Sequence, residues 1–243
     1  MTGRGRTFGT IALLVAAGLA LTADARVYRS LGFFMGRALF NAELLGKAVY
    51  RAAMQINGGN AEVTVVQARE DMAGIRRAVQ SAGAGQEARF EGGDSLGFGF
   101  VSGGDRSVRL LALTPGGREN TLVVTVDQSK QDEKESEASR ATHGIPDVPA
   151  YPGGAVTCFM KNADTRTCFE TQKVQVGADA AAAFYSDALP RNGWAPVFPR
   201  GSRAEAGLQV FVKGADLCCV RIKAADSSGE SDVTLLHKRG AVE

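Results

Sequence analysis

The feature that most constrains this chain is an internal repeat, because the same order of sequence signals occurs twice. In each half, two apolar runs are split by a polar turn, at Asn57-Gly58-Gly59-Asn60 and again at Asn162-Ala163-Asp164. Asn and Gly reach positive φ at low cost, so both segments predict β-hairpins. Two copies of one domain are expected rather than a solenoid, whose period is about 20–50 residues.

A helix is predicted after each hairpin, since apolar residues recur there at spacings of three and four. The apolar positions are Ala68, Met72, Ile75 and Val79 in the first half, and Ala181, Phe184, Tyr185, Ala188 and Leu189 in the second. Gly83 and Gly193 are expected to end the two helices, and they stand 110 residues apart.

Strands are predicted after each helix. Residues 96–113 resemble residues 207–224, and a last apolar run follows at 121–126 and at 232–237. The implied unit is β-β-α-β-β-β, in which one helix covers one face of an antiparallel sheet. The sequence therefore predicts an α+β fold of two tandem two-layer sandwiches.

The first 25 residues have the pattern of a cleaved secretory signal peptide. Arg4 and Arg6 precede an apolar run over residues 10–22, and Ala23-Asp24-Ala25 supplies small residues for cleavage near Ala25. The expected location is the periplasm or the extracellular space. The alternative is an uncleaved membrane anchor, although a spanning helix needs about 20 apolar residues.

Residues 26–47 are expected to form an N-terminal amphipathic helix with Leu31, Met35, Leu39 and Leu45 on one side. One interpretation packs this helix on the first sheet. In the other, residues 27–47 form an arm that docks on an envelope protein or on the membrane surface.

Residues 127–146 separate the two repeats, which are placed at 48–126 and 147–240. The segment 127–142 has no aromatic residue and no aliphatic residue larger than Ala, so it is interpreted as an exposed charged linker. The alternative is a charged surface helix, because Glu and Lys are good helix formers.

The four cysteines favour disulfides in an exported chain. Cys158 and Cys168 flank the turn centred on Ala163, so they are predicted to face each other and to form a disulfide. Cys218 and Cys219 are adjacent in a strand and should point to opposite faces. No metal site is predicted, because no CxxC spacing occurs and no histidine lies close to the cysteines.

Gly93-Asp94-Ser95-Leu96 spells the motif of a family of serine hydrolases. A serine nucleophile needs a base within hydrogen-bonding reach, and the chain has only His143 and His237. At the repeat offset, Ser95 corresponds to Glu205, so the motif is interpreted as a turn. No catalytic residue and no cofactor site are predicted, and a hydrolase that uses Ser95 is kept as an alternative.

The second half resembles a module of uncharacterised exported bacterial proteins that carries a YPG…T…FY…L…GW pattern. The matching residues here are Tyr151-Pro152-Gly153, Thr171, Phe184-Tyr185, Leu189 and Gly193-Trp194. The first half has Ile75 and Arg76 in place of the aromatic pair. The resemblance implies export and an α+β fold, and it implies no activity.

The sequence leads to an expected function as a non-enzymatic binding or assembly module of the bacterial envelope, with an envelope protein as partner. A net charge of +2 without a basic cluster gives no electrostatic footprint for nucleic acid. A small-ligand carrier with a pocket between the repeats is the further alternative.

Overall fold

A computed structural model describes residues 40–82, 87–114, 121–139, 144–198, 207–225 and 229–240. Within these residues the chain is α+β, with three α-helices and twelve antiparallel strands. Contacts divide the chain into two units. The first contains residues up to 53 and residues 59–135, and the second contains residues 54–58 and the chain from 136 onward.

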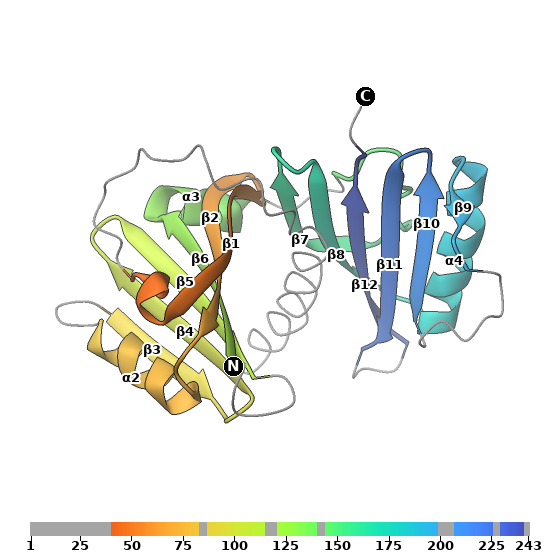
Figure 1. Ribbon diagram of the computed structural model, residues 1–243. Coiled ribbons are helices and arrows are strands. Elements are labelled where there is room, and N and C mark those ends of the chain that lie inside the picture. The colour runs from red at the N-terminus through yellow and green to blue at the C-terminus, as the bar shows by residue number, and fades with distance from the viewer. Residues whose placement is uncertain are drawn as a thin grey trace. The chain divides into compact units, whose positions relative to one another are not determined.

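The first unit is a sheet with one helix inserted after its second strand (Figure 1). Its elements are β1 (Gly46–Ile56), β2 (Gly59–Ala68), α2 (Met72–Ser81), β3 (Glu87–Gly92), β4 (Leu96–Gly103), β5 (Arg106–Leu113) and β6 (Thr121–Ser129). The pairing order is β3-β4-β5-β6-β2-β1.

The turn between β1 and β2 is the one that the sequence predicts. Asn57 has φ of 47° and Gly58 has φ of 93°, as a tight hairpin turn requires. Residues 54–58 belong to the second unit through their contacts with β7. The Asn57 amide donates to the Phe159 carbonyl at 2.8 Å, and the Phe159 amide donates to Asn57 Oδ1 at 2.7 Å.

Helix α2 begins at a capped end and buries three of the four residues of the predicted stripe, while the fourth, Ala68, is the last residue of β2. The Asp71 carboxylate accepts from the Gly74 amide at 2.8 Å, which satisfies one of the free donors of the first turn. Met72, Ile75 and Val79 are buried. The sheet residues in the same core cluster are Val66, Ala68, Val101, Leu110, Ala112 and Val123.

The second unit contains the same kinds of element in the same order. Its elements are β7 (Ala155–Asn162), β8 (Thr167–Val174), α4 (Ala178–Arg191), β9 (Ala195–Pro196), β10 (Leu208–Lys213), β11 (Asp216–Ala224) and β12 (Ser231–Lys238). The pairing order is β7-β8-β12-β11-β10-β9. In both units the strands therefore follow one another across the sheet as first, second, sixth, fifth, fourth and third.

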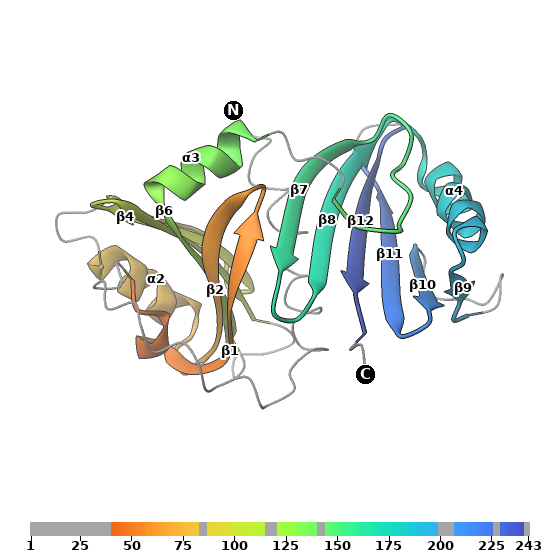
Figure 2. The same ribbon diagram turned by 90° about the horizontal axis from the view of Figure 1, so that it is seen from above.

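Helix α4 packs on β11 and β12 and buries Ala181, Tyr185 and Leu189 (Figure 2). Its end is a Schellman motif, in which the Trp194 amide donates to the Leu189 carbonyl and the Gly193 amide donates to the Pro190 carbonyl. Gly193 has φ of 83°, a conformation that favours glycine. The motif turns the chain so that Trp194 enters the core.

The predicted number of strands in each unit is wrong. Each unit has a further strand after its helix, β3 in the first and β9 in the second, so the count is six strands rather than five. β3 has one large apolar side chain, Phe90, and β9 is only two residues long, so neither gives a clear alternating pattern.

The exposed linker predicted over residues 127–146 is also wrong for most of its length. Residues 127–129 complete β6, and the chain continues as helix α3 (Lys130–Ala138). Polar contacts hold this helix in place: Arg109 Nη2 lies 2.5 Å from Glu133 Oε1, and the Asn60 amide donates to Asp132 Oδ1 at 2.9 Å. The alternative of a charged helix is the correct one, because ion pairs and hydrogen bonds replace the missing apolar stripe.

The predicted helix over residues 26–47 does not extend through the part that the structure describes. Ala42–Leu44 is a short 3-10 helix, and β1 begins at Gly46. Leu45 belongs to the core of the first unit as a strand-entry residue rather than as part of a helical stripe. Residues 26–39 and the signal peptide at 1–25 lie outside the described residues.

Candidate functional site

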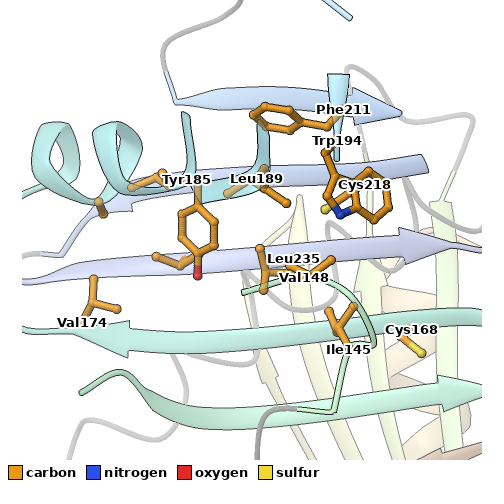
Figure 3. Packing of buried hydrophobic residues seen from close by; sticks show 14 residues of the cluster. Ile145, Val148, Cys168, Val174, Tyr185, Leu189, Trp194, Phe211, Cys218 and Leu235 are labelled. Carbon is orange, nitrogen blue, oxygen red and sulfur yellow. The ribbon is translucent and has the colours of Figure 1, made fainter. Parts of the chain in front are cut away.

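Residues 144–154, called here the entry segment, precede β7 and line the core beneath α4. Ile145 and Val148 are buried in the same cluster as Tyr185, Leu189 and Leu235 (Figure 3). The segment passes close to the sheet at Gly144, where a Cβ would lie 2.7 Å from the ring of Phe159. The entry segment is therefore part of the fold of the second unit.

Aromatic side chains fasten the entry segment to α4 and to the turn that follows it. Trp194 Nε1 donates to the Asp147 carbonyl at 2.8 Å. Tyr151 packs against Phe184 with ring centroids 4.8 Å apart, and Phe184 packs against Tyr185 at 5.0 Å. These are residues of the YPG…FY…GW pattern, so the pattern has a structural role in attaching this segment.

His237 lies in β12 between two cysteines of the neighbouring strands. It pairs in register with Cys168 of β8 and with Cys218 of β11, so the three side chains share the face that α4 covers. The His237 side chain is 1% exposed, and Trp194 packs on it edge to face at 5.6 Å. Neither imidazole nitrogen has a hydrogen-bond partner among the described residues.

Burial lowers the pKa of His237 below its ordinary value of 6.5, because the charged form loses its hydration. The Asp216 carboxylate opposes this effect, with its Oδ2 3.7 Å from His237 Nε2, while Arg239 acts in the same direction as burial. The imidazole is therefore neutral at neutral pH.

Glu170 and Gln172 lie further along the same face of β8 and are also buried. The Glu170 carboxylate accepts from the Gly144 amide at 3.1 Å and from Gln172 Nε2 at 2.6 Å. The first of these bonds connects the sheet to the start of the entry segment. Burial and the nearby Glu170 raise the pKa of Tyr185, so its hydroxyl stays protonated.

The buried thiols are poor nucleophiles. Burial raises the pKa of Cys218 to about 12. Burial, together with the charge of Glu170, raises the pKa of Cys158 to about 12 as well. Burial raises the pKa of Cys168 and of Cys219 in the same way. The thiolate is the reactive form of cysteine, so none of the four is activated.

The disulfide predicted between Cys158 and Cys168 is wrong for this structure, in which all four cysteines are free. Asn162 pairs with Thr167, so the β7–β8 turn is centred beyond Ala163 and the register differs from the predicted one. The register stays constant from the turn to Cys158, and the one register shift lies beyond it, between Val156 and Cys158. Cys158 consequently pairs with Thr171, and Cys168 pairs with Lys161.

Ser95 lies in an exposed bend between β3 and β4 of the first unit. Its carbonyl accepts from the Thr114 amide at 2.9 Å, so the residue has a role in the turn. The first unit contains no histidine, since His143 and His237 both belong to the second. His237 is buried under Trp194, and His143 lies outside the described residues.

Sequence reasoning did not identify Asp147, Glu170 or Asp216 as parts of this cluster. Glu170 had a usable signal, because in a strand it shares a face with Cys168 and Val174, which are both core residues. Asp147 has a positive φ of 61°, and its contribution is a backbone carbonyl, which no side-chain pattern reveals.

Among the described residues, no group of three or more His, Cys, Asp or Glu side chains is arranged to hold a metal ion. The helices in the same part of the chain are all too short or too polar to cross a bilayer. Comparison of the chain with protein-family models, with curated proteins and with solved structures finds no match.

Proposed function

We propose that this chain is an exported, non-catalytic module of the bacterial envelope that binds or assembles with another protein. We further propose that it consists of two tandem copies of one helix-backed sheet. The shared pairing order and the shared position of the helix after the second strand support the duplication. The leader-like pattern of residues 1–25 supports export.

The observation that carries the binding proposal is an apolar surface on the second sheet. The side chains opposite to the α4 face that are half-exposed or exposed, called here the open face, are Leu208, Val210, Val212, Leu217, Cys219 and Leu236. Val210, Cys219 and Leu236 lie side by side in register on β10, β11 and β12. Contiguous apolar side chains on a protein surface are typical of sites of protein contact.

Charges at the margin of the open face indicate the kind of partner. Alternation along the strands places four basic residues and one acidic residue on this side of the sheet: Lys173, Arg221, Lys223, Lys238 and Asp232. Basic groups around an apolar centre favour a partner that presents apolar side chains surrounded by carboxylates.

The geometry around Ser95 supports a non-catalytic role. A hydrolase would need a base within hydrogen-bonding reach of an exposed serine, and the imidazole of His237 is enclosed in a core. The carrier with a pocket between the repeats stays a prediction, and ligand binding to the purified chain would test it.

Photo-crosslinking in intact cells tests the binding proposal. A photoreactive residue at position 212, where Val212 is 36% exposed, is compared with one at position 96 of the first unit, where Leu96 is 37% exposed. We expect a discrete adduct from position 212 alone, and we expect Leu236→Glu to remove it. An adduct with the mass of two copies would assign the open face to self-assembly. Equal adducts from both positions, or none, would refute the proposal.

Export is tested separately by sequencing the N-terminus of the protein recovered from each cell fraction. The expected sequence begins at Arg26, in the periplasmic or secreted fraction. An intact N-terminus in the cytoplasmic fraction would contradict export without bearing on the open face.

A further inference from the structure

His237 occupies a position where a charge has no good partner. An imidazolium carries two N–H donors, and both ring nitrogens are buried without a hydrogen-bond partner among the described residues. Asp216 Oδ2 lies 3.7 Å from Nε2, beyond hydrogen-bonding distance, and Asp216 Oδ1 already accepts from the Gly240 amide at 2.9 Å. Asp216 can therefore satisfy at most one of the two donors.

The titratable and charged side chains near His237 come from β8, β11, the end of β12 and the entry segment. β11 contributes Asp216 and Cys218, β8 contributes Cys168, the residue after β12 contributes Arg239, and the entry segment contributes Asp147. Asp147 Oδ2 lies 3.7 Å from Arg239 Nη2, and both side chains are about half-exposed. Asp147 is thus paired with Arg239 and does not accept from the imidazolium. The N–H that Asp216 does not reach would need a water molecule as its acceptor.

The cover over His237 is weakest on the side of Trp194. β8 and β11 are each bonded to β12 along eight paired residues. Trp194, in contrast, is held to the entry segment through one hydrogen bond to the Asp147 carbonyl. Asp147 itself adopts φ of 61°, in the left-handed region, which aspartate adopts more readily than most residues other than glycine. Water reaches the imidazole most easily if this contact opens.

We propose that His237 makes the attachment of the entry segment acid-sensitive: protonation of the imidazole separates Trp194 from Asp147 and releases residues 144–150 from the second unit. The release exposes the apolar surface that Ile145 and Val148 cover. The lowered pKa of His237 supports this inference, since it keeps the segment attached at neutral pH. The inference is independent of the open face and of its partner.

Trp194 is the only tryptophan of the chain, so intrinsic fluorescence reports on this contact directly. On acidification of the full chain from about pH 8 to about pH 5, we expect a red shift of Trp194 emission. The midpoint should lie below 6.5, the ordinary pKa of histidine. The far-UV circular dichroism should stay constant, and hydrogen exchange, corrected for its intrinsic pH dependence, should show loss of protection at residues 144–150.

Three variants make the test specific. His237→Leu should abolish both changes, because leucine fills the core without titrating. Asp216→Asn keeps the acceptor for the Gly240 amide and removes the compensating charge, so it should move the midpoint to lower pH. His143→Gln should leave the transition unchanged. Should His237→Leu fail to fold, the direction of the Asp216→Asn shift still decides.

The proposal is overturned if the transition persists in His237→Leu or disappears in His143→Gln. It is also overturned if Asp216→Asn raises the midpoint or leaves it unchanged. A fluorescence change without faster exchange at residues 144–150, or with loss of the far-UV signal, would likewise exclude a local release.

Discussion

The two units share one order of elements but fill the space between helix and sheet differently. In the first unit the core under α2 is almost entirely aliphatic, with Ile75 and Val79 facing Val66 and Val123. In the second unit Tyr185 and Trp194 occupy the corresponding region. One arrangement of strands thus accepts two different cores, since volume and apolar patterning decide whether a core forms.

The two units differ more sharply in the polar side chains that they bury. The buried polar side chains described in the first unit are neutral, and Thr121 is typical, with its Oγ1 2.9 Å from Thr114 Oγ1. Glu170 and His237, the two ionisable polar residues buried among the described residues, both belong to the second unit. A change of pH is therefore expected to act on the core of the second unit more than on that of the first.

The outer faces differ in degree. On the first sheet the side opposite to α2 carries Val63, Val65, Leu111 and Val124, all buried, with half-exposed Phe98 beside Leu111. On the second sheet the corresponding side carries buried Phe169 and Met160 next to the half-exposed valine and leucine of the open face. The basic side chains around the open face, together with its apolar centre, are the reason for assigning partner binding to the second unit.

Truncation of core side chains should give the largest effects on stability. It also tests whether the two units unfold independently. Leu189→Ala and Ile75→Ala each remove a side chain with 0% exposure and should cost about 2–5 kcal/mol. In urea, followed by Trp194 fluorescence, Leu189→Ala should lower the transition midpoint while Ile75→Ala leaves it unchanged. Equal shifts for both variants would show that the units unfold as one.

Alanine substitutions at two glycines of the first unit should give smaller effects. A Cβ at Gly97 would lie 2.4 Å from the Phe90 ring, so Gly97→Ala should destabilise the first unit by about 1–3 kcal/mol. Gly93→Ala is the matched control, because nothing lies within 4 Å of its Cβ position and the change should stay within about 0.5 kcal/mol. Circular dichroism in urea measures both, and similar costs would argue against close packing at Gly97.

The ion pair that holds α3 should contribute less again. Glu133→Gln weakens the contact with Arg109 and should cost up to about 1 kcal/mol, because both groups are partly exposed. Glu135→Gln, on the exposed side of the same helix, serves as the control. If the urea midpoint falls equally for both variants, the ion pair between Glu133 and Arg109 does not stabilise α3.

No effect is expected from Ser95→Ala on ester hydrolysis. The first unit lacks a histidine, so no imidazole is available to Ser95 from its own unit. Purified protein assayed with a small chromogenic ester provides the measurement. A rate that is above background and is lost in Ser95→Ala would restore the hydrolase alternative.

Local sequence signals were sufficient for the elements with strong patterns. Asn57-Gly58 predicted the first hairpin, and the spacing of Ile75 and Val79 predicted α2, because backbone conformation and periodicity decide these features locally. α3 has no apolar periodicity that would predict a helix from the sequence alone. Its stability comes from Arg109 and Asn60, which are distant in sequence.

The candidate site was predictable only in part. Trp194 belongs to the GW pair that follows the second predicted helix, and the structure has it buried just after the end of α4. The position of His237 between Cys168 and Cys218 depends on the register of three strands, and an error in the β7–β8 turn was enough to misplace the cysteines. Register is set by turn geometry and by long-range pairing, which a single sequence does not reveal.

Acid is expected to destabilise the second unit and not the first. The folded-state pKa of His237 is lowered, so the unfolded chain binds the proton first. The stability of the second unit should be complete above pH 6.5 and should decline as the pH falls below it. Protonation of Asp127 in the first unit has the opposite effect on stability. Burial raises the pKa of Asp127 above 3.8, so acid favours the folded state there.

Urea unfolding at about pH 8 and about pH 5 measures this most directly. Trp194 fluorescence follows the second unit, and hydrogen exchange of peptides from β5 follows the first. We predict that acid lowers the urea midpoint for Trp194 and does not lower that for β5. Equal shifts in both units, or a shift confined to β5, would contradict the account.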